Sequence, residues 1–573
     1  MGQNLKIVSS QYKHLLNRKD DYINGRAITK ASVLKNEPFS FQALYRAKGG
    51  RFSHPVSISI KTPLPVKTWR VDYVPITNAV ASESGKEYES IEPGLYPDIL
   101  TPRPINPPIV AAGKEQRFYF EKDTAATLNA TADNYGAVWF TVNPYSKAML
   151  SGDYEIEIEL ISLITNETLE IEFLHLKIID ELLPRQDFYY TNWLHVDCLC
   201  EFYSVKAYSN DFYKIFDKYV LNMTEHGQNT LLLPSFTPAL DTVEGEERMN
   251  VQLIDIEKSK SGYKFDFSKM RKFVRRAKRN GIEFFEHTHL FSQWGAKNAP
   301  NIYDVHGNRI FGFDTEAGSD EYIRFLRDYL TEFIKFAKEE KIEKKLIFHL
   351  SDEPVKEQIE NYRIAHKAVS DLLIGNPICD AMYDFTLHEA GLVDQPIIAT
   401  KNLGNYDFDR HDTMWLYYTG GDESTSNRKI SNTAAATRAI GIHMYKYKAK
   451  GFLHWAYNYY YDRLSFGYSA PQAFPNAYKA LPGISYLAYP VNERGEKTVT
   501  PSTREKLMRE AMDDYRALKL LETLIGRERT LAVLEDKLGA ITVYTIPEGE
   551  ALRELREIVN AKIEECVQCD PAR

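Results

Sequence analysis

Residues 345–375 read KLIFHLSDEPVKEQIENYRIAHKAVSDLLIG, and this stretch decides the fold. The apolar run LIFHL is typical of a buried strand, and the segment after Pro354 is helical in pattern and ends at Gly375. A buried strand followed at once by a helix is the repeating unit of a parallel sheet with helical crossovers.

The same unit recurs on both sides of this stretch. Seven further strand-like runs lie at residues 189–196, 229–236, 282–290, 377–384, 396–400, 413–419 and 451–457. The helices predicted over 271–280 and 433–450 end in basic residues followed by a glycine, which is the expected helix C-terminus. Eight strands with helical crossovers predict a (β/α)8 TIM-like barrel.

The chain is too long for one hydrophobic core, and its periodicity changes along its 573 residues. Alternating runs such as VSISIKT and YEIEIELISL before residue 185 predict an antiparallel β-sandwich. Beyond about residue 500 the chain is charged and helical, with a possible short strand at AITVYT. We predict a multidomain β plus α/β protein with a sandwich at 1–185, a barrel at 186–495 and a C-terminal helical appendix at 496–573.

Composition excludes some classes of partner. The chain has 71 basic and 79 acidic residues, a net charge of −8 and no block of like charge, so nucleic acid is not an expected partner. Aromatic residues make up 13% of the chain, which suits sugar stacking as well as core packing. The composition says nothing of oligomeric state.

Membrane and export signals are not evident in the sequence. No 18 apolar residues run together, and the N-terminus lacks the apolar stretch of a signal peptide, so we expect a cytoplasmic protein without a membrane partner. The cysteines form no disulfide framework. Cys566 and Cys569 form a C-x-x-C pair without the second pair that a structural zinc site needs.

Polar and aromatic side chains follow the predicted strands at their C-terminal ends, where barrels of this kind carry their active sites. We expect these residues to bind substrate: Trp193, His195, Asp197, His287, His289, Tyr383, Asp384, Trp415, Tyr417, Trp455, Tyr457 and Asn458.

Asp352 and Glu353 are the candidate catalytic pair. Two acids directly after a buried strand must face the barrel mouth or be paired. Where the strand turns into a helix, both carboxyl groups can converge on one ligand, and Glu353 reaches one methylene further. The alternative is structural: SDEP begins a helix, with Ser351 or Asp352 as its N-cap and Pro354 near its first position.

The histidines raise a metal hypothesis. His287 and His289 lie two apart on a predicted strand and should face the same way, as a zinc pair would. Residues that orient sugar hydroxyl groups have the same pattern, and a core histidine bonded to backbone is common. We expect no metal at this site.

Three motifs together resemble glycoside hydrolase family 123 and the related bacterial proteins grouped as domain of unknown function 4091. These motifs are LHVDCLCEFY at 194–203, FHLSDEP at 348–354 and GFLHWAYNYYYD at 451–462. The resemblance covers about residues 187–520 and implies the barrel with a sandwich before it.

The resemblance also implies an activity. Characterised members of the family are exo-acting β-N-acetylgalactosaminidases that retain configuration by substrate-assisted catalysis. Glu353 matches the general acid/base, and Asp352 matches the acid that orients the 2-acetamido group of the substrate. The intermediate would be an oxazolinium ion, which requires no cofactor. By position, Trp415, Tyr417 and Trp455 would surround the sugar. Since no signal peptide is evident, we expect a short imported oligosaccharide or glycoside as the substrate.

Two alternatives stay open from the sequence. The first is a glycosidase on a sugar without the acetamido group, with Asp197 or Asp384 as the nucleophile. The second is a carbohydrate-binding barrel protein that has lost the chemistry.

Overall fold

The part of the chain that can be described is nearly continuous after residue 134. The computed structural model describes residues 4–16, 26–46, 54–77, 87–90, 92–102, 109–110, 116–119, 128–130, 134–238, 248–260, 262–292, 295–405, 412–420, 424–463, 466–468, 471–472, 481–493 and 495–569.

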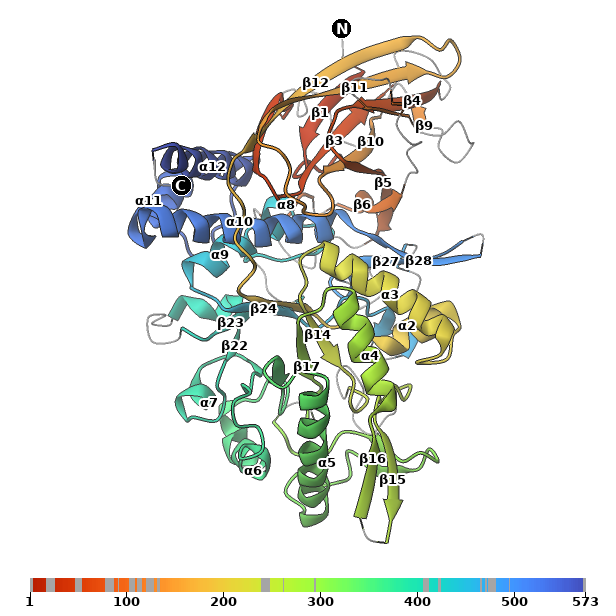
Figure 1. Cartoon of the computed structure of the whole chain (residues 1–573), viewed down its shortest axis with the longest axis vertical. Helices are drawn as coiled ribbons and strands as arrows, with labels where there is room; N and C mark the ends of the chain where they lie inside the picture. The colour runs from red at the N-terminus through yellow and green to blue at the C-terminus, as the bar shows by residue number, and fades with distance from the viewer. Residues whose placement is uncertain are drawn as a thin grey trace.

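Two β-sheets form the N-terminal domain, which we call the β domain, at the upper end of the molecule in Figure 1. The first has the order β1 (Leu5–Ser9), β3 (Phe39–Tyr45), β10 (Gly136–Val142), β5 (Val66–Ile76) and β6 (Gly94–Pro102). The second has the order β2 (Lys30–Leu34), β12 (Thr168–Ile179), β11 (Gly152–Ser162), β4 (His54–Lys61), β8 (Gln116–Tyr119) and β7 (Ile109–Val110), with β9 (Leu128–Ala130) also paired to β4.

The sequence pattern of β11 explains how the two sheets pack. Ile156, Ile158 and Leu160 are buried, whereas Glu155 is exposed and Glu157 is half-buried. Strand side chains alternate between faces, so this pattern turns one apolar face inward. Apolar residues from both sheets form a single core cluster. The strands pair antiparallel except for β2 and β12, which are parallel.

Eight parallel strands follow in chain order, as predicted, but they lie in two sheets. The larger has the order β13 (Tyr189–Asn192), β24 (Gly451–His454), β23 (Trp415–Tyr417), β22 (Ile397–Ala399) and β21 (Ala381–Met382). The smaller has the order β14 (Thr230–Leu233), β17 (Phe284–His287) and β20 (Leu346–Phe348). We call these eight strands and their helices the parallel-strand domain.

The predicted single closed barrel is absent from the described residues, because the edges of the two sheets meet only through short contacts. Asn229 donates its backbone N–H to the Tyr190 carbonyl at 3.2 Å, and Cys379 donates to the Phe348 carbonyl at 2.8 Å. Strands of two to four residues leave too few paired groups for a continuous ladder at these two junctions.

Helices connect the parallel strands. They are α2 (Val196–Tyr203), α3 (Asn210–Glu225), α4 (Ser268–Arg279), α5 (Asp320–Glu339), α6 (Ile359–Val369), α7 (Thr386–Glu389), α8 (Ala434–Arg438) and α9 (Ile440–Lys446). Short hairpins precede α4 and α5: β15 (Asp255–Ser259) with β16 (Gly262–Asp266), and β18 (Ile302–Tyr303) with β19 (Arg309–Phe311). The helix predicted over 433–450 is divided at Ala439 into α8 and α9.

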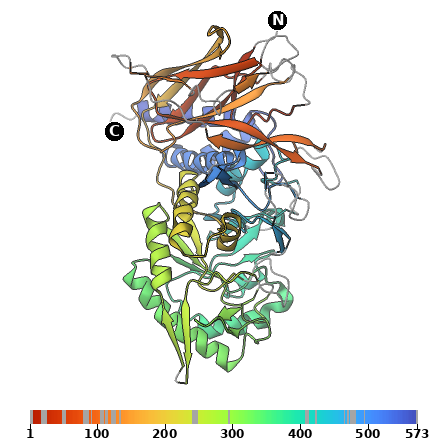
Figure 2. The ribbon, with the colours of Figure 1, turned by 90° about the vertical axis from the view of Figure 1, so that its right-hand side faces the viewer.

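The C-terminal segment begins with the hairpin β27 (Ala488–Glu493) and β28 (Glu496–Pro501). It continues with α10 (Thr503–Ile525), α11 (Arg527–Leu538) and α12 (Ala551–Gln568). The strand predicted at AITVYT is wrong, because residues 541–545 form a turn. Helix α10 lies between the β domain and the parallel-strand domain (Figures 1 and 2). The predicted appendix therefore contacts both domains.

Candidate active site

Glu353 lies in the loop that follows β20, and its backbone is unusual. Its φ is 44°, in the left-handed region that non-glycine residues rarely adopt. The 3-10 turn Lys356–Gln358 and then α6 begin only after this loop. Glu353 is therefore not in the first turn of a helix, and the structural alternative for SDEP is wrong.

Two tyrosines hold the Glu353 carboxylate. Tyr383 donates its hydroxyl to Oε2 at 2.9 Å, and Tyr417 donates to Oε1 at 2.9 Å. Tyr383 follows β21 and Tyr417 ends β23, so residues after three different strands meet at one carboxylate. The structure thus brings together Glu353, Tyr383 and Tyr417, three of the residues predicted for the site.

The environment keeps Tyr417 a hydrogen-bond donor. Burial, followed by the negative charges of Glu353 and Asp352, raises the pKa of Tyr417 well above its usual value. Asp352 is half-buried beside Glu353. The two adjacent acids therefore act on the same phenol, which stays neutral.

Ser351 fixes the start of the loop that carries Asp352 and Glu353, which we call the acidic loop. Its hydroxyl donates to the Ser292 carbonyl at 2.8 Å and accepts the backbone N–H groups of Gly295 and Ala296 at 3.0 and 2.9 Å. Pro354, on the other side of the acids, is buried. The loop is thus held at both ends.

His195 and Asp197 are bound to a residue that the sequence analysis missed. Arg248 donates Nε to Asp197 at 2.8 Å, and its Nη2 lies 3.0 Å from His195 Nδ1. Burial opposes the ionisation of Asp197, but Arg248 outweighs it and lowers the Asp197 pKa. Burial, together with the Arg248 charge, lowers the pKa of His195 to about 4. Both residues begin α2 and do not extend β13.

The two histidines predicted to face the same way diverge. His287 points toward α5, where its Nε2 lies 2.8 Å from the Tyr329 hydroxyl. His289 instead stacks on His349, with ring centroids 4.9 Å apart. The expectation of a shared face is wrong because β17 ends at His287, so strand alternation does not extend to His289.

Two of the predicted tryptophans are enclosed. Trp415 begins β23 and therefore lies at the opposite end of the strands from the acids; its ring stacks on Tyr189 at 4.6 Å. Trp193 is 2% exposed and donates Nε1 to Glu286 at 3.1 Å. The expectation that Trp415 lines the mouth is wrong. Trp455 is half-buried and makes an edge contact with His195.

The remaining predicted residues have structural partners. Tyr457 points between α3 and α10, where it donates to Glu505 at 2.8 Å, so it does not face the strand ends. Asn458 exchanges two hydrogen bonds with the backbone of His195, at 2.8 and 3.0 Å. Asp384 accepts the backbone N–H of Thr386, the first residue of α7, at 2.8 Å.

Three buried charged residues near the strands were missed by the sequence analysis. Glu286 and Asp380 are isolated acids within the apolar runs FFEH and ICDAM, a signal that could have identified them. Arg428 is fully buried and donates to Asn192 at 2.6 Å; burial lowers its pKa to about 9. It lies in a loop without a pattern that predicts its burial.

One group in the described part of the chain could offer three metal ligands. His289, His349 and Asp380 each have a ligand atom within 4.8 Å of the others. The two rings stack with their centroids 4.9 Å apart, and both nitrogens of His349 already face carboxyl groups, those of Glu286 and Asp380. The arrangement fits a hydrogen-bonded cluster better than a metal centre.

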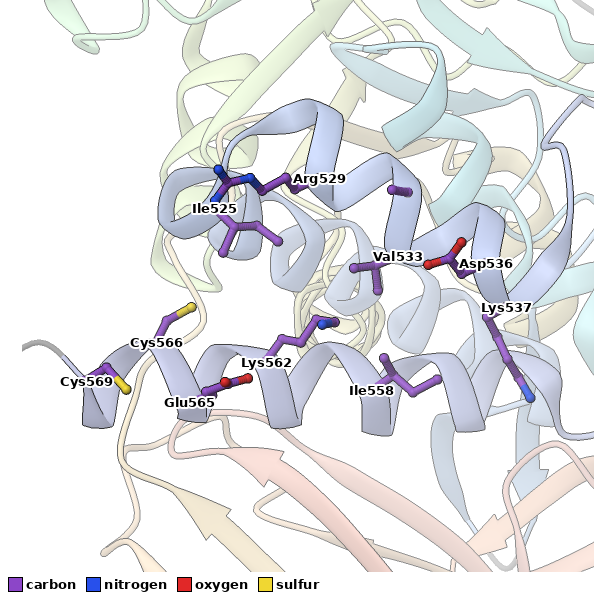
Figure 3. Close-up of a pocket in the computed structure, with 11 residues that line it drawn as sticks. Ile525, Arg529, Val533, Asp536, Lys537, Ile558, Lys562, Glu565, Cys566 and Cys569 are labelled. Atoms are coloured by element: carbon purple, nitrogen blue, oxygen red, sulfur yellow. The ribbon is translucent and has the colours of Figure 1, made fainter.

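Two cavities in the described part of the chain lie away from the acids Asp352 and Glu353. A cavity of 590 Å³ opens between α11 and α12, lined by Val533, Ile558 and Cys566 among others (Figure 3). Another, of 530 Å³, lies where α3 meets β28 and the β domain. Neither contains a residue predicted for the site.

None of the helices in the described ranges is both long and apolar enough to cross a membrane.

Comparison with known proteins identifies the family. The model of the glycoside hydrolase 123 catalytic domain matches residues 193–521. A family 123 glycoside hydrolase from Clostridium perfringens, described in terms of glycolipid glycan hydrolysis, has a similar structure with a TM-score of 0.72. The two are 14% identical over 98% of this chain and 97% of that chain, so this likeness concerns the fold.

A glycosyl hydrolase family 2 member from Bacteroides cellulosilyticus is much less similar. It has a TM-score of 0.28 and 11% identity over 79% of this chain and 48% of that chain. No curated protein matches the sequence. Because the family model covers more than half of the chain, the protein is a glycosidase and belongs to glycoside hydrolase family 123.

Proposed function

We propose that this glycosidase is an exo-acting, retaining β-N-acetylgalactosaminidase that uses the 2-acetamido group of its substrate as the nucleophile. The observation that carries the proposal is the pair Asp352 and Glu353 after β20, with the Glu353 carboxylate bound by Tyr383 and Tyr417 at 2.9 Å each. Such a pair supplies a proton donor and an adjacent anion at one point.

In the first step Glu353, in its protonated form, donates a proton to the glycosidic oxygen. The acetamido carbonyl oxygen attacks the anomeric carbon as the bond to the aglycone breaks, and the aglycone leaves as an alcohol. Asp352 accepts the acetamido N–H and stabilises the positive charge of the oxazolinium ion. Glu353 then takes a proton from water, which attacks the anomeric carbon, opens the oxazolinium ring and restores the original configuration.

The surrounding residues support these roles. Tyr383 and Tyr417 orient Glu353 through the two bonds already described, so its rotation is restricted before substrate arrives. Trp455 is the predicted tryptophan with appreciable accessible surface, and we assign to it the stacking face for the sugar ring.

A carboxylate nucleophile is less well supported. Asp197 is buried in an ion pair with Arg248, and leaving that pair would strand the arginine charge. Asp384 binds the backbone N–H of Thr386 in α7. The proposed substrate is a short glycan or glycoside, and the glycan of a glycolipid is one such substrate. The proposed compartment is the cytoplasm.

The test is hydrolysis of 4-nitrophenyl β-glycosides of GalNAc, GlcNAc, Gal and Glc by the wild type and three variants. We expect release from GalNAc that falls about 1,000-fold in Glu353→Gln, which loses the proton donor. In Asp352→Asn it should fall about 100-fold because the charge beside the oxazolinium ion is lost. Glu357→Gln is the matched control, since Glu357 is exposed four residues further on.

A GalNAc-derived thiazoline, which mimics the oxazolinium ion, should also inhibit the wild type. Turnover of GalNAc glycosides by Glu353→Gln at the wild-type rate would refute the assignment. Turnover of a 2-hydroxy glycoside with a trapped glycosyl-enzyme would favour the carboxylate mechanism instead.

A further inference from the structure

Three ionisable side chains lie fully buried behind the acidic loop. Glu286 is 0%, His349 1% and Asp380 0% exposed. Isolated charges in such a place cost several kcal/mol unless they are paired, so their presence needs a reason. They come from β17, from the end of β20 and from the segment just before β21.

His349 joins the two acids. Its Nε2 lies 3.1 Å from Glu286 Oε1, and its Nδ1 lies 3.5 Å from Asp380 Oδ1. Burial opposes a charged imidazole, but the contacts with Asp380 and Glu286 outweigh it and raise the pKa of His349 to about 9. The ring is therefore an imidazolium ion at neutral pH, and it lies between Glu286 and Asp380.

Glu286 is held in place by hydrogen bonds to residues other than His349. Besides His349 it accepts Trp193 Nε1 at 3.1 Å and the Thr191 hydroxyl at 2.5 Å, both from or next to β13. His289 stacks on the His349 ring, and burial lowers its pKa well below the usual value, so it adds no charge. Glu286 and the stacked His289 ring thus hold the His349 imidazolium in place.

Asp380 is the member of the Glu286–His349–Asp380 group that contacts the acidic loop. Its carboxylate accepts the backbone N–H groups of Leu350 and Ser351, each at 3.1 Å, and the Tyr362 hydroxyl at 2.5 Å. These two amides directly precede Asp352 and Glu353. Ser351, whose amide Asp380 binds, therefore lies only two residues before the proton donor Glu353.

We propose that Asp380 and His349 are positioning residues that hold the Asp352–Glu353 loop in its reactive geometry. Glu353 has a left-handed backbone, which persists only where its surroundings determine it. Asp380 fixes the amides just before Glu353. The imidazolium of His349, itself held by Glu286, faces the Asp380 carboxyl and opposes the rise in its pKa that burial causes. This inference rests on the proposed function for its catalytic consequence, but its structural consequence can be measured without substrate.

The test compares Asp380→Asn with Asp394→Asn in the full-length protein. Asp394 also accepts a backbone N–H, that of Ile378 at 2.9 Å, but it lies at the other end of the strands. We expect kcat to fall about 100-fold in Asp380→Asn, with KM changed less than about threefold, because misplaced catalytic groups slow the chemical step. Asp394→Asn should keep the wild-type kcat.

A second readout needs no turnover. Hydrogen–deuterium exchange of a peptide spanning Leu350 and Ser351 should be faster in Asp380→Asn than in the wild type or in Asp394→Asn. His349→Gln should behave similarly, because glutamine retains a donor toward Glu286 but removes the cation beside Asp380. If either variant unfolds, Tyr362→Phe removes only one donor to Asp380 and should give a smaller rise in exchange together with a smaller loss of kcat.

Unchanged exchange in the folded variants would overturn the proposal, as would a rise in KM without a fall in kcat. One bound divalent metal ion per chain, lost in Asp380→Asn, would also overturn it. If the wild type hydrolyses no glycoside while exchange rises as expected, the proposed substrate is wrong and the positioning of the loop stands.

Discussion

At the scale of single residues, the site depends on a backbone conformation of Glu353 that residues with a side chain rarely adopt. A non-glycine residue in the left-handed region costs about 1–2 kcal/mol. Glu353 adopts it with its carboxylate oxygens bound by Tyr383 and Tyr417. Observed strain of this kind points to a functional constraint.

Tyr417→Phe tests one of these bonds. A hydrogen bond to a charged group contributes about 1.5 kcal/mol, so we expect kcat for the preferred glycoside to fall about tenfold. Tyr213→Phe is the control, because the buried Tyr213 hydroxyl has no hydrogen-bond partner among the described residues. Equal rates for the two variants would show that Tyr417 does not orient the acid.

The sequence predicted these residues unevenly. Glu353, Tyr383 and Tyr417 were found because each follows or ends a short apolar run. Trp415 was misplaced because an apolar run does not reveal where within it the strand begins. Arg248 could not be foreseen, because its partners Asp197 and His195 lie about fifty residues earlier in the chain.

At the scale of elements, strand order was predictable and helix continuity was not. Each parallel strand shows a local apolar run, so its existence and order can be read from the sequence. The division between α8 and α9 occurs where α9 packs closely on α10, seventy residues away in the chain. Such a long-range contact has no local signal.

Gly441→Ala tests this close approach. A Cβ at Gly441 would lie 2.1 Å from the Ala511 carbonyl oxygen of α10, a backbone atom that cannot rotate away. We expect the free energy of unfolding in urea to fall by about 1–3 kcal/mol. Gly94→Ala is the control, since its nearest neighbour would be 3.9 Å away. A stability change no larger than that of the control would mean that the helices can separate without cost.

At the scale of the whole molecule, a buried ion pair joins the β domain to the C-terminal segment. Asp98 of β6 accepts Arg504 Nη2 of α10 at 2.9 Å, and both side chains are 0% exposed. Arg556 of α12 binds Glu37 at 2.6 Å in the same region. The sequence predicted an appendix on the barrel because its charged helices resemble a solvated surface.

Asp98→Asn should lower the free energy of unfolding by about 3–5 kcal/mol, because it leaves a buried arginine without its counter-charge. Glu332→Gln is the control for an exposed pair with Lys335 and should change stability by less than about 1 kcal/mol. Chemical denaturation of both variants checks this. Similar losses in the two would mean that Arg504 finds compensation in the carbonyl groups around it.

The contact between early strands and late helices also sets an order of events during synthesis. Ser32 of β2 binds Glu557 of α12, and Asp98 binds Arg504, so more than four hundred residues separate the partners. A ribosome therefore completes the β sheets long before it releases the helices that cover them. Until α10 and α12 are synthesised, the face of the β domain that they cover is exposed to solvent. We expect chaperones to bind the nascent chain at this face.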